Sequence, residues 1–232
     1  MSAQNDLEAL SQFGVGSIWR KRVAPAHFEL RRVLMIAEHR VYTSSHINVD
    51  KIFFDYEFCD LYAPLGVDPS QISLAGSGHR PEHIARGKLT IEEVREKIFG
   101  FYVDLLRWLR PKEVISGLAR GFDLWLAWAA IESDTPLIGA CPFPQQARQW
   151  SEDDQLEWKA VMDAATEVHT VSPTFWEKDG DNALHARNRW MVDRGTHLTS
   201  FWQGTRGGTA HANDYAVLVG RPRLVINTLN GW

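Results

Sequence analysis

Three glycine clusters follow three apolar, strand-like segments and are candidates for a ligand-binding site. They are Gly76-Ser77-Gly78, Ser116-Gly117 with Gly121, and Gly204 with Gly207-Gly208. Glycine stands at a strand end where the chain turns sharply or where a ligand approaches the backbone closely. The last cluster also precedes a helical segment, and the free N–H groups at a helix start favour an anion. An ordinary loop is the alternative there, but the three clusters together predict a phosphate-binding site.

Polar side chains beside these clusters could complete such a site. Arg80 follows the first cluster and could hold a phosphate through two hydrogen bonds, or pair with Glu82 at the surface. Arg187 lies on a helical segment, where a ligand contact and an ion pair with Asp193 are both open. We interpret Ser116 as a turn residue or a phosphate contact, because the sequence locates no base that would make it a nucleophile.

Motif spacing excludes several common sites. The Gly-Lys-Ser/Thr of a P-loop is missing, and the Gly-x-Gly-x-x-Gly spacing of dinucleotide-binding proteins fails. The histidines show no metal-binding spacing, and no Gly-x-Ser-x-Gly elbow occurs. Cys59 and Cys141 are the two cysteines, so one disulfide is possible but no paired zinc motif exists. We therefore expect neither a metal nor a resident cofactor.

Strands and helices alternate after Pro64–Pro69, and this alternation must position the clusters. A capping box, Thr90 with Glu93, starts the strongest amphipathic helix, which Pro111 ends. The run 122–131 is apolar nearly all round and predicts a buried helix, with Trp125 and Trp128 packed in the core. Further helices are expected at 151–165, 182–194 and 209–219, and strands at 72–75, 113–115, 137–140, 168–171, 198–202 and 224–226.

This order predicts an α/β fold, a Rossmann-like and mainly parallel sheet with helices on both faces. Ligands of such folds lie outside the carboxyl ends of the strands, where all three glycine clusters fall. Gly76-Ser77-Gly78 is expected to form a tight turn after the strand at 72–75. We divide the chain into residues 1–70, an N-terminal extension that packs on the core or forms an oligomer interface, and the ligand-binding domain 71–232.

Composition limits the partners and the location. The 232 residues include 25 Lys and Arg against 29 Asp and Glu, for a formal net charge of −4. This balance argues against nucleic acid as a partner, although it leaves room for a local basic pocket. No apolar run approaches the roughly 20 residues that span a bilayer. The acidic N-terminus is unlike a signal peptide, so we expect a cytoplasmic protein without a membrane partner.

The order of the motifs resembles the SLOG superfamily, Rossmann-like proteins that include YpsA-like proteins, "Lonely guy" phosphoribohydrolases and DNA-processing protein A. The resemblance is nearest to the YpsA-like members and covers about residues 71–227, whereas residues 1–70 match nothing. It implies a nucleotide-type ligand over the strand ends and a homo-oligomer, a dimer or a tetramer. The matching pieces are ISLAGSGHRP, VISGLARGFDLWLAWAA, the CPF strand end, ALHARNRWMVDRGTHLTSFW and QGTRGGTAHANDYA.

The resemblance also implies site residues: Gly76, Ser77, Gly117, Arg187, Gly207, Gly208 and Thr209. With their neighbours, the predicted ligand-binding set is Gly76, Ser77, Gly78, Arg80, Ser116, Gly117, Arg120, Arg187, Asn188, Gly207, Gly208 and Thr209. Hydrolases of the superfamily carry a glutamate in the last glycine loop, and this chain has Ala212 there. A carboxylate at that place would stabilise an oxocarbenium-like transition state. Arg187 and Asp214 remain the catalytic candidates.

Three functions follow. The first is binding of a phosphorylated ribonucleotide, such as ADP-ribose, an NAD-derived, a cyclic or a mononucleotide ligand, for sensing or sequestration in antiviral nucleotide signalling. The second is hydrolysis by a nucleoside 5′-monophosphate phosphoribohydrolase. The third is single-stranded DNA binding, which needs a positive groove with stacking aromatic side chains.

Overall fold

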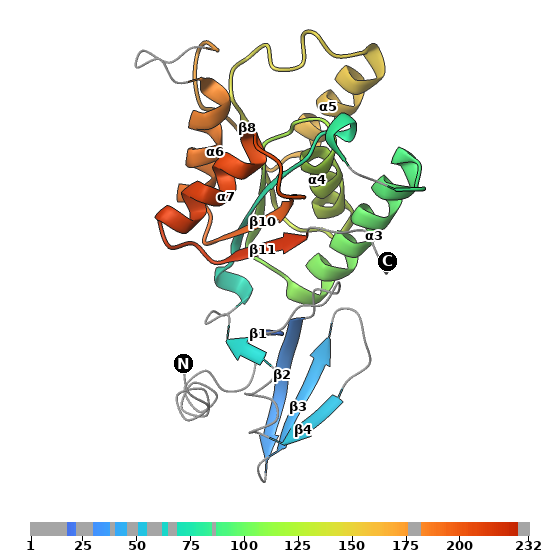
Figure 1. Cartoon of the computed structure of the whole chain (residues 1–232), viewed down its shortest axis with the longest axis vertical. Helices are drawn as coiled ribbons and strands as arrows, with labels where there is room; N and C mark the ends of the chain where they lie inside the picture. Colours follow the sequence, from blue (N-terminus) through green and yellow to red (C-terminus); the bar gives the residue numbers. More distant parts are fainter. Residues whose placement is uncertain are drawn as a thin grey trace. The chain divides into compact units, whose positions relative to one another are not determined.

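The computed structural model describes residues 69–84, 87–175 and 182–226 fully, together with the backbone of five strands between residues 18 and 64. The chain forms two compact units, one made mainly of Met1–Gln71 and the other of most residues from Ile72 onward (Figure 1). Cys59 and the apolar residues next to it lie outside the described residues.

The first unit contains a five-stranded antiparallel sheet in the order β4-β3-β2-β1-β5. Residues 1–70 were expected only to form an N-terminal extension, and no sheet was predicted there. Its register shifts between Val33 and Met35, so β2 carries an irregularity of the kind that a β-bulge makes. The strands are β1 (Ile18–Lys21), β2 (Leu30–Ala37), β3 (Arg40–Ser45), β4 (Lys51–Phe54) and β5 (Tyr62–Pro64).

The second unit is built on a six-stranded parallel sheet in the order β11-β10-β6-β7-β8-β9. Its strands are β6 (Ser73–Gly78), β7 (Glu113–Ser116), β8 (Leu137–Cys141), β9 (Glu167–Thr170), β10 (His197–Phe201) and β11 (Arg223–Ile226). The sheet and its helices confirm the predicted α/β, Rossmann-like fold.

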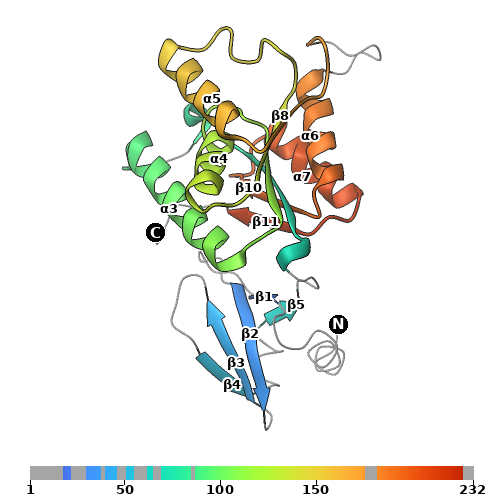
Figure 2. The same ribbon diagram turned by 180° about the vertical axis from the view of Figure 1, so that it is seen from behind.

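Helices cover both faces of this sheet. Figures 1 and 2 show α3 (Ile91–Leu109), α4 (Phe122–Glu132) and α5 (Glu152–Ala164) on one face. The other face carries α6 (Ala183–Arg194) and α7 (Gly208–Leu218). Short 3₁₀ helices occur at Pro69–Gln71 and Pro81–His83.

Two of the helix starts follow directly from the sequence. Before α3, the Thr90 N–H donates to Glu93 Oε2 at 2.7 Å and the Glu93 N–H donates to Thr90 Oγ1 at 3.2 Å, which confirms the capping box. Before α5, Ser151 Oγ accepts from the Asp154 N–H, as expected for an N-cap.

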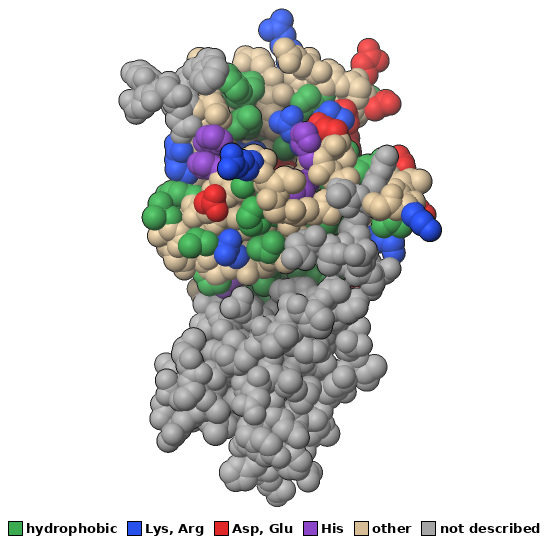
Figure 3. All heavy atoms as spheres, viewed as in Figure 1, with side chains coloured by type: hydrophobic (Ala, Val, Ile, Leu, Met, Phe, Trp, Pro, Cys, Tyr) green, Lys and Arg blue, Asp and Glu red, His purple; other side chains and the backbone are tan. Residues whose placement is uncertain are grey.

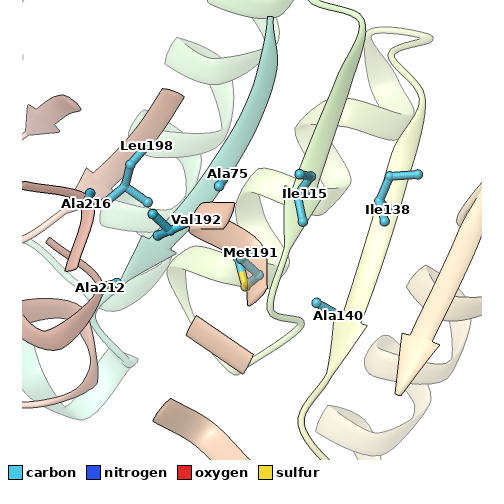
Figure 4. Packing of buried hydrophobic residues seen from close by; sticks show 9 residues of the cluster. All are labelled: Ala75, Ile115, Ile138, Ala140, Met191, Val192, Leu198, Ala212 and Ala216. Carbon is cyan, nitrogen blue, oxygen red and sulfur yellow. The ribbon is translucent and has the colours of Figure 1, made fainter. Parts of the chain in front are cut away.

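Small residues let α6 and α7 approach the sheet closely. A cluster of nine buried residues fills this layer, and four of the nine are alanines (Figure 4). Met191 and Val192 project from α6 toward Ile115 and Leu198 on the strands. The cluster consists of Ala75, Ile115, Ile138, Ala140, Met191, Val192, Leu198, Ala212 and Ala216. Close packing of this kind fixes the position of α6 on the face of the sheet, and with it the position of the α6 side chains near the strand ends.

Gly76 and Gly78 lie within β6, so the expected tight turn at these residues is wrong. A Cβ on Gly78 would overlap the base of the Phe122 side chain, and a Cβ on Gly76 would overlap Leu126. Both partners belong to α4. The glycines therefore serve close packing of α4 against β6.

The strand order reverses between β6 and β10, which are neighbours in the sheet. The chain continues from β6 toward β7 on one side and from β10 toward β11 on the other. Such a reversal leaves a crevice outside the carboxyl ends of the two strands. The ends of β6 and β10 therefore mark the place where a ligand fits.

A pair of glycine substitutions tests the packing of β6. We expect Gly78→Ala to lower the free energy of unfolding by about 3 kcal/mol, because Phe122 cannot move its Cβ without moving α4. Gly100 lies in α3 with nothing near its missing Cβ, so Gly100→Ala should stabilise the protein by about 0.5–1 kcal/mol. Urea unfolding curves measure both; equal effects of the two substitutions would contradict the packing role.

Candidate functional site

A cavity of about 340 Å³ lies at the reversal point of the sheet. It is bounded by the end of β6, the start of α4, the first turns of α6 and the segment that leads into α7. Eight of the twelve predicted ligand-binding residues line it: Ser77, Gly78, Arg80, Arg187, Asn188, Gly207, Gly208 and Thr209. Its other lining residues are His79, His83, Ala119, Asp123, Leu184, Thr205 and Arg206.

The start of α7 presents backbone amides to this cavity. Gly207 is the N-cap with φ 144° and ψ −163°, a conformation that favours glycine. Asn188, which is 3% exposed, donates from Nδ2 to the Gly208 carbonyl at 2.9 Å and so fixes this start to α6. The N–H groups of the first turn have no partner within the helix and favour an anion.

A buried ion pair forms one wall of the cavity. Arg187 Nη1 on α6 lies 3.2 Å from Asp123 Oδ2 on α4, and these side chains are 7% and 4% exposed. Asp123 Oδ1 also accepts from the Gly78 N–H at 3.1 Å. Burial raises the pKa of Asp123 and lowers the pKa of Arg187, and their mutual attraction opposes both shifts.

The Arg187 guanidinium keeps a donor unused. Its Nε is buried and has no hydrogen-bond partner among the described residues, although the side chain lines the cavity. The expected alternative partner, Asp193, instead accepts from the Tyr215 hydroxyl at 3.0 Å and 3.2 Å. A buried guanidinium with a spare N–H is well suited to bind an anion.

His79 connects the end of β6 to the segment before α7. Its Nε2 accepts from the Gln203 N–H at 3.0 Å, which requires an unprotonated Nε2. Burial, followed by the nearby His83, lowers the pKa of His79. The neutral imidazole therefore holds the segment that carries Thr205 and Arg206 into the cavity.

Four predicted ligand contacts do not line the cavity, and each has a structural task. Gly76 packs under α4, and Ser116 Oγ donates to the Asp123 carbonyl at 2.7 Å. A Cβ on Gly117 would overlap the Arg187 guanidinium. Arg120 pairs through Nε with Asp154 at 2.9 Å and lies 4.0 Å from Glu82. Gly117 and Ser116 therefore support Arg187 and Asp123 rather than lining the cavity.

The two catalytic candidates are placed differently. Arg187 lines the cavity, whereas Asp214 is exposed on α7 and does not. Among the described residues that line the cavity, Asp123 is the one carboxylate, and it is already held by Arg187 and Gly78. The position expected for a hydrolytic carboxylate is therefore not filled by Asp214.

The cavity has a basic lining although the chain is acidic. Among the described residues, Arg80, Arg187 and Arg206 line it, against the single carboxylate of Asp123. Figure 3 shows Lys, Arg and His side chains gathered around a hollow in the upper half of the coloured unit. Many carboxylates lie instead on α3 and α5, which begin with acidic first turns. The net charge therefore says little about this site.

Among the described residues, no group of His, Cys, Asp and Glu could hold a metal ion. In the same part of the chain, no helix is both long and apolar enough to cross a bilayer. Cys141 is a free thiol, and burial raises its pKa to about 11.

Sequence reasoning missed His79, Asp123 and Arg206 as parts of the site. Asp123 follows the second glycine cluster, and Arg206 lies inside the third, so both stand next to a recognised signal. His79 also follows a cluster directly, but its role depends on a contact with Gln203 across 124 positions of the chain. Proximity to a strand end could have identified Asp123 and Arg206, whereas the role of His79 could be recognised only from the fold.

Comparison with known proteins gives a curated relative and several solved structures that resemble parts of this chain. No family model matches it. The SPβ prophage-derived protein YoqJ of Bacillus subtilis is 24% identical over 140 residues, which is 55% of this chain and 82% of that protein.

Two solved structures of DNA-processing protein A have a similar arrangement. The Helicobacter pylori protein, described for its binding of single-stranded DNA, has a TM-score of 0.47 and 16% identity, covering 69% of this chain and 68% of that chain. The Streptococcus pneumoniae protein has a TM-score of 0.43 and 18% identity, covering 67% and 50%. DNA-processing protein A is one of the members named in the sequence resemblance.

This comparison corrects the expected partners. The sequence predicted a small-molecule nucleotide and argued against nucleic acid, whereas the Helicobacter pylori protein is described for its binding of single-stranded DNA. The earlier argument was wrong because it used the net charge of the whole chain. Binding depends on the charge near the contact, and three arginines lie at the cavity.

The pKa of His79 yields a prediction about pH. Because this pKa is lowered in the folded protein, the unfolded chain takes up the proton first, and stability should fall as the pH drops below about 6.5. His79→Gln can keep an acceptor for the Gln203 N–H but does not titrate. We therefore expect its melting temperature to fall less than that of the wild type between about pH 7.5 and pH 5.

His197 provides the background for this comparison, because burial lowers its pKa as well and it remains in both proteins. Parallel losses of melting temperature in the wild type and in His79→Gln would contradict the role given to His79.

Proposed function

We propose that this protein binds single-stranded DNA and holds one of its phosphates in the strand-end cavity. The observation that carries the proposal is Arg187, a buried residue that lines the same cavity as the start of α7 and whose Nε has no hydrogen-bond partner among the described residues. A guanidinium and several backbone N–H groups around one hollow match the oxygens of a phosphate.

Two exposed arginines extend the cavity toward a polyanion. Arg80 and Arg206 line the cavity and are exposed, so they can reach phosphates that do not enter it. The phosphates of a free nucleotide, including the pyrophosphate of ADP-ribose, lie next to one another, whereas a strand presents a separate phosphate at every step. The arrangement of one buried and two exposed arginines therefore favours a polymer.

Aromatic side chains lie at the same edge of the sheet. Phe143 follows β8 and Phe175 follows β9, and their rings meet edge to face with centroids 5.4 Å apart. Phe175 is 37% exposed. Since β8 lies two strands from β6, the pair stands roughly 10 Å along the edge from the end of β6 at the usual strand spacing. Unpaired bases can stack on such rings, which favours single strands over duplexes.

The same reasoning argues against hydrolysis as the main function. Cleavage of an N-glycosidic bond needs a carboxylate that faces the reacting carbon. Asp123 is held by Arg187 and Gly78, and Asp214 does not line the cavity.

We further propose that the second unit belongs to the SLOG superfamily and that the protein acts in the cytoplasm, where single-stranded DNA is accessible.

The first test measures the contribution of the exposed arginines. We expect Arg80→Gln and Arg206→Gln each to weaken the binding of a fluorescent oligothymidine of about 16 nucleotides by roughly threefold to tenfold, measured by anisotropy. Each substitution should also lower the salt slope by about 0.7, because one phosphate contact is lost.

Lys112→Gln is the matched control, because Lys112 is exposed and lies just before β7. It is therefore at the amino-terminal ends of the strands, whereas the cavity lies at their carboxyl ends. An equal loss in Lys112→Gln would mean that DNA responds to the overall charge. Failure of the wild type to bind the oligonucleotide would refute the proposal.

Competition experiments show whether the cavity recognises a DNA strand or a free nucleotide. Unlabelled oligothymidine should displace the probe, whereas ADP-ribose, nucleoside monophosphates and duplex DNA should compete weakly. A free phosphorylated ribonucleotide shares the phosphate chemistry of a strand. Stronger competition by one of these nucleotides would assign the cavity to a small ligand and its sensing or sequestration instead.

The second test addresses Arg187 itself. Arg187→Lys keeps a positive charge beside Asp123 but removes Nε and the planar fork of donors. We expect the affinity for oligothymidine to fall at least about tenfold, with a smaller loss for inorganic phosphate, which needs fewer oriented donors. Thermal unfolding serves as the control for folding, and a folded variant with unchanged affinity would contradict the role of Arg187.

A further inference from the structure

A second hollow, of about 420 Å³, lies between α3 and α4. Its apolar lining consists of Phe99 on α3 and Trp125, Trp128 and Ile131 on α4. Three carboxylates also line it, those of Glu92, Glu96 and Glu132. We call it the α3–α4 pocket. It shares no lining residue with the strand-end cavity.

The α3–α4 pocket has an unneutralised negative charge. Among the described residues, Arg95 is the one basic residue that lines the pocket, and it is already paired with Glu157 at 2.7 Å. Glu157 also accepts from Trp128 Nε1 at 3.0 Å. Glu132 is paired with Arg107 at 3.0 Å. By contrast, Glu92 and Glu96 make no ion pair with any described residue.

We propose that the α3–α4 pocket binds a small organic cation with one positive charge and an aromatic or branched aliphatic body. The apolar lining would bury the body of the ligand, which is favourable in proportion to the area removed from water. The indole rings and the free carboxylates of Glu92 and Glu96 both attract a cation. The same groups disfavour phosphate and other anions.

The size of the pocket favours a small molecule over a protein. Its volume is that of ordinary ligand sites. A stable protein interface buries about 800 Å² on each partner, with an apolar centre. Among the described residues, the exposed large hydrophobic side chains are Leu156, Val168, Phe175 and Val217 to Val219. None of them lies on α3 or α4. The apolar surface is therefore confined to the pocket itself.

A matched series of three ligands tests this proposal on the full-length protein. The probes are 2-phenylethylammonium, the neutral 2-phenylethanol and the anionic 3-phenylpropionate, which share a phenyl ring on a short chain. We expect the cation to bind with a Kd on the order of 0.1 to 1 mM, the alcohol roughly tenfold more weakly and the anion not at all. Isothermal calorimetry gives the affinities.

The place of binding is read from the indole N–H signal of Trp128, assigned by its absence in Trp128→Phe. Because this N–H donates to Glu157 at the pocket, it should shift on saturation with the cation. No saturable binding of the cation, or binding without a shift of this signal, would overturn the proposal.

Two substitutions separate the pocket from general charge effects. We expect Glu96→Gln to weaken the cation about threefold to tenfold. Asp104→Asn removes the same charge from an exposed residue of α3 that does not line the pocket, and it should change nothing. Equal binding of cation and alcohol, or equal losses in the two variants, would refute recognition of a cation by the pocket.

Discussion

The ion pair between Arg187 and Asp123 joins the two helical layers across the carboxyl edge of the sheet. Arg187 comes from α6 on one face, and Asp123 comes from α4 on the other. Taking both charges out of water is costly, and such a pair persists only where further hydrogen bonds satisfy it. The Gly78 N–H gives one of these bonds to Asp123. The Nε of Arg187, a residue that lines the cavity, has no such partner among the described residues.

Glycines make this arrangement possible for two different physical reasons. Gly78 and Gly117 provide space, one for Phe122 of α4 and one for the Arg187 guanidinium. Gly207 provides a backbone conformation with φ 144°, which opens α7 with its amides toward the cavity. A larger residue at any of the three positions would change the shape of the cavity, although among these glycines only Gly78 and Gly207 line it. A glycine cluster at a strand end therefore need not consist of ligand contacts.

The sequence predicted the sheet of the second unit because most of its strands are buried runs between turn signals, although the edge strand β9 is largely exposed. Helix starts at Thr90 and Ser151 were equally readable, since a cap uses residues three positions apart. The end of β6 was misjudged, because Gly76 and Gly78 look like a turn unless the partners on α4 are known. The sheet of the first unit was not predicted, since its strands lack a clear alternation of apolar and polar residues.

The site was readable in part for the same reason. Residues at strand ends and helix starts, such as Ser77 and Thr209, follow from local pattern alone. The partner of Arg187 does not, because 64 positions of sequence separate it from Asp123 and a nearer candidate, Asp193, was available. The contact between His79 and Gln203 is likewise nonlocal. Local signals therefore located the cavity, and only the fold identified the pairs that shape it.

Charge is separated within the second unit, and this separation explains how an acidic chain can carry a basic cavity. Surface charges are largely screened beyond about 8 Å at physiological salt, so distant carboxylates act weakly on a bound phosphate. The carboxylates of Glu92 and Glu96 border the α3–α4 pocket, whereas Arg80 and Arg206 border the strand-end cavity. On the two proposals, the hollows would bind ligands of opposite charge through the residues within reach, and the net charge of −4 describes neither hollow.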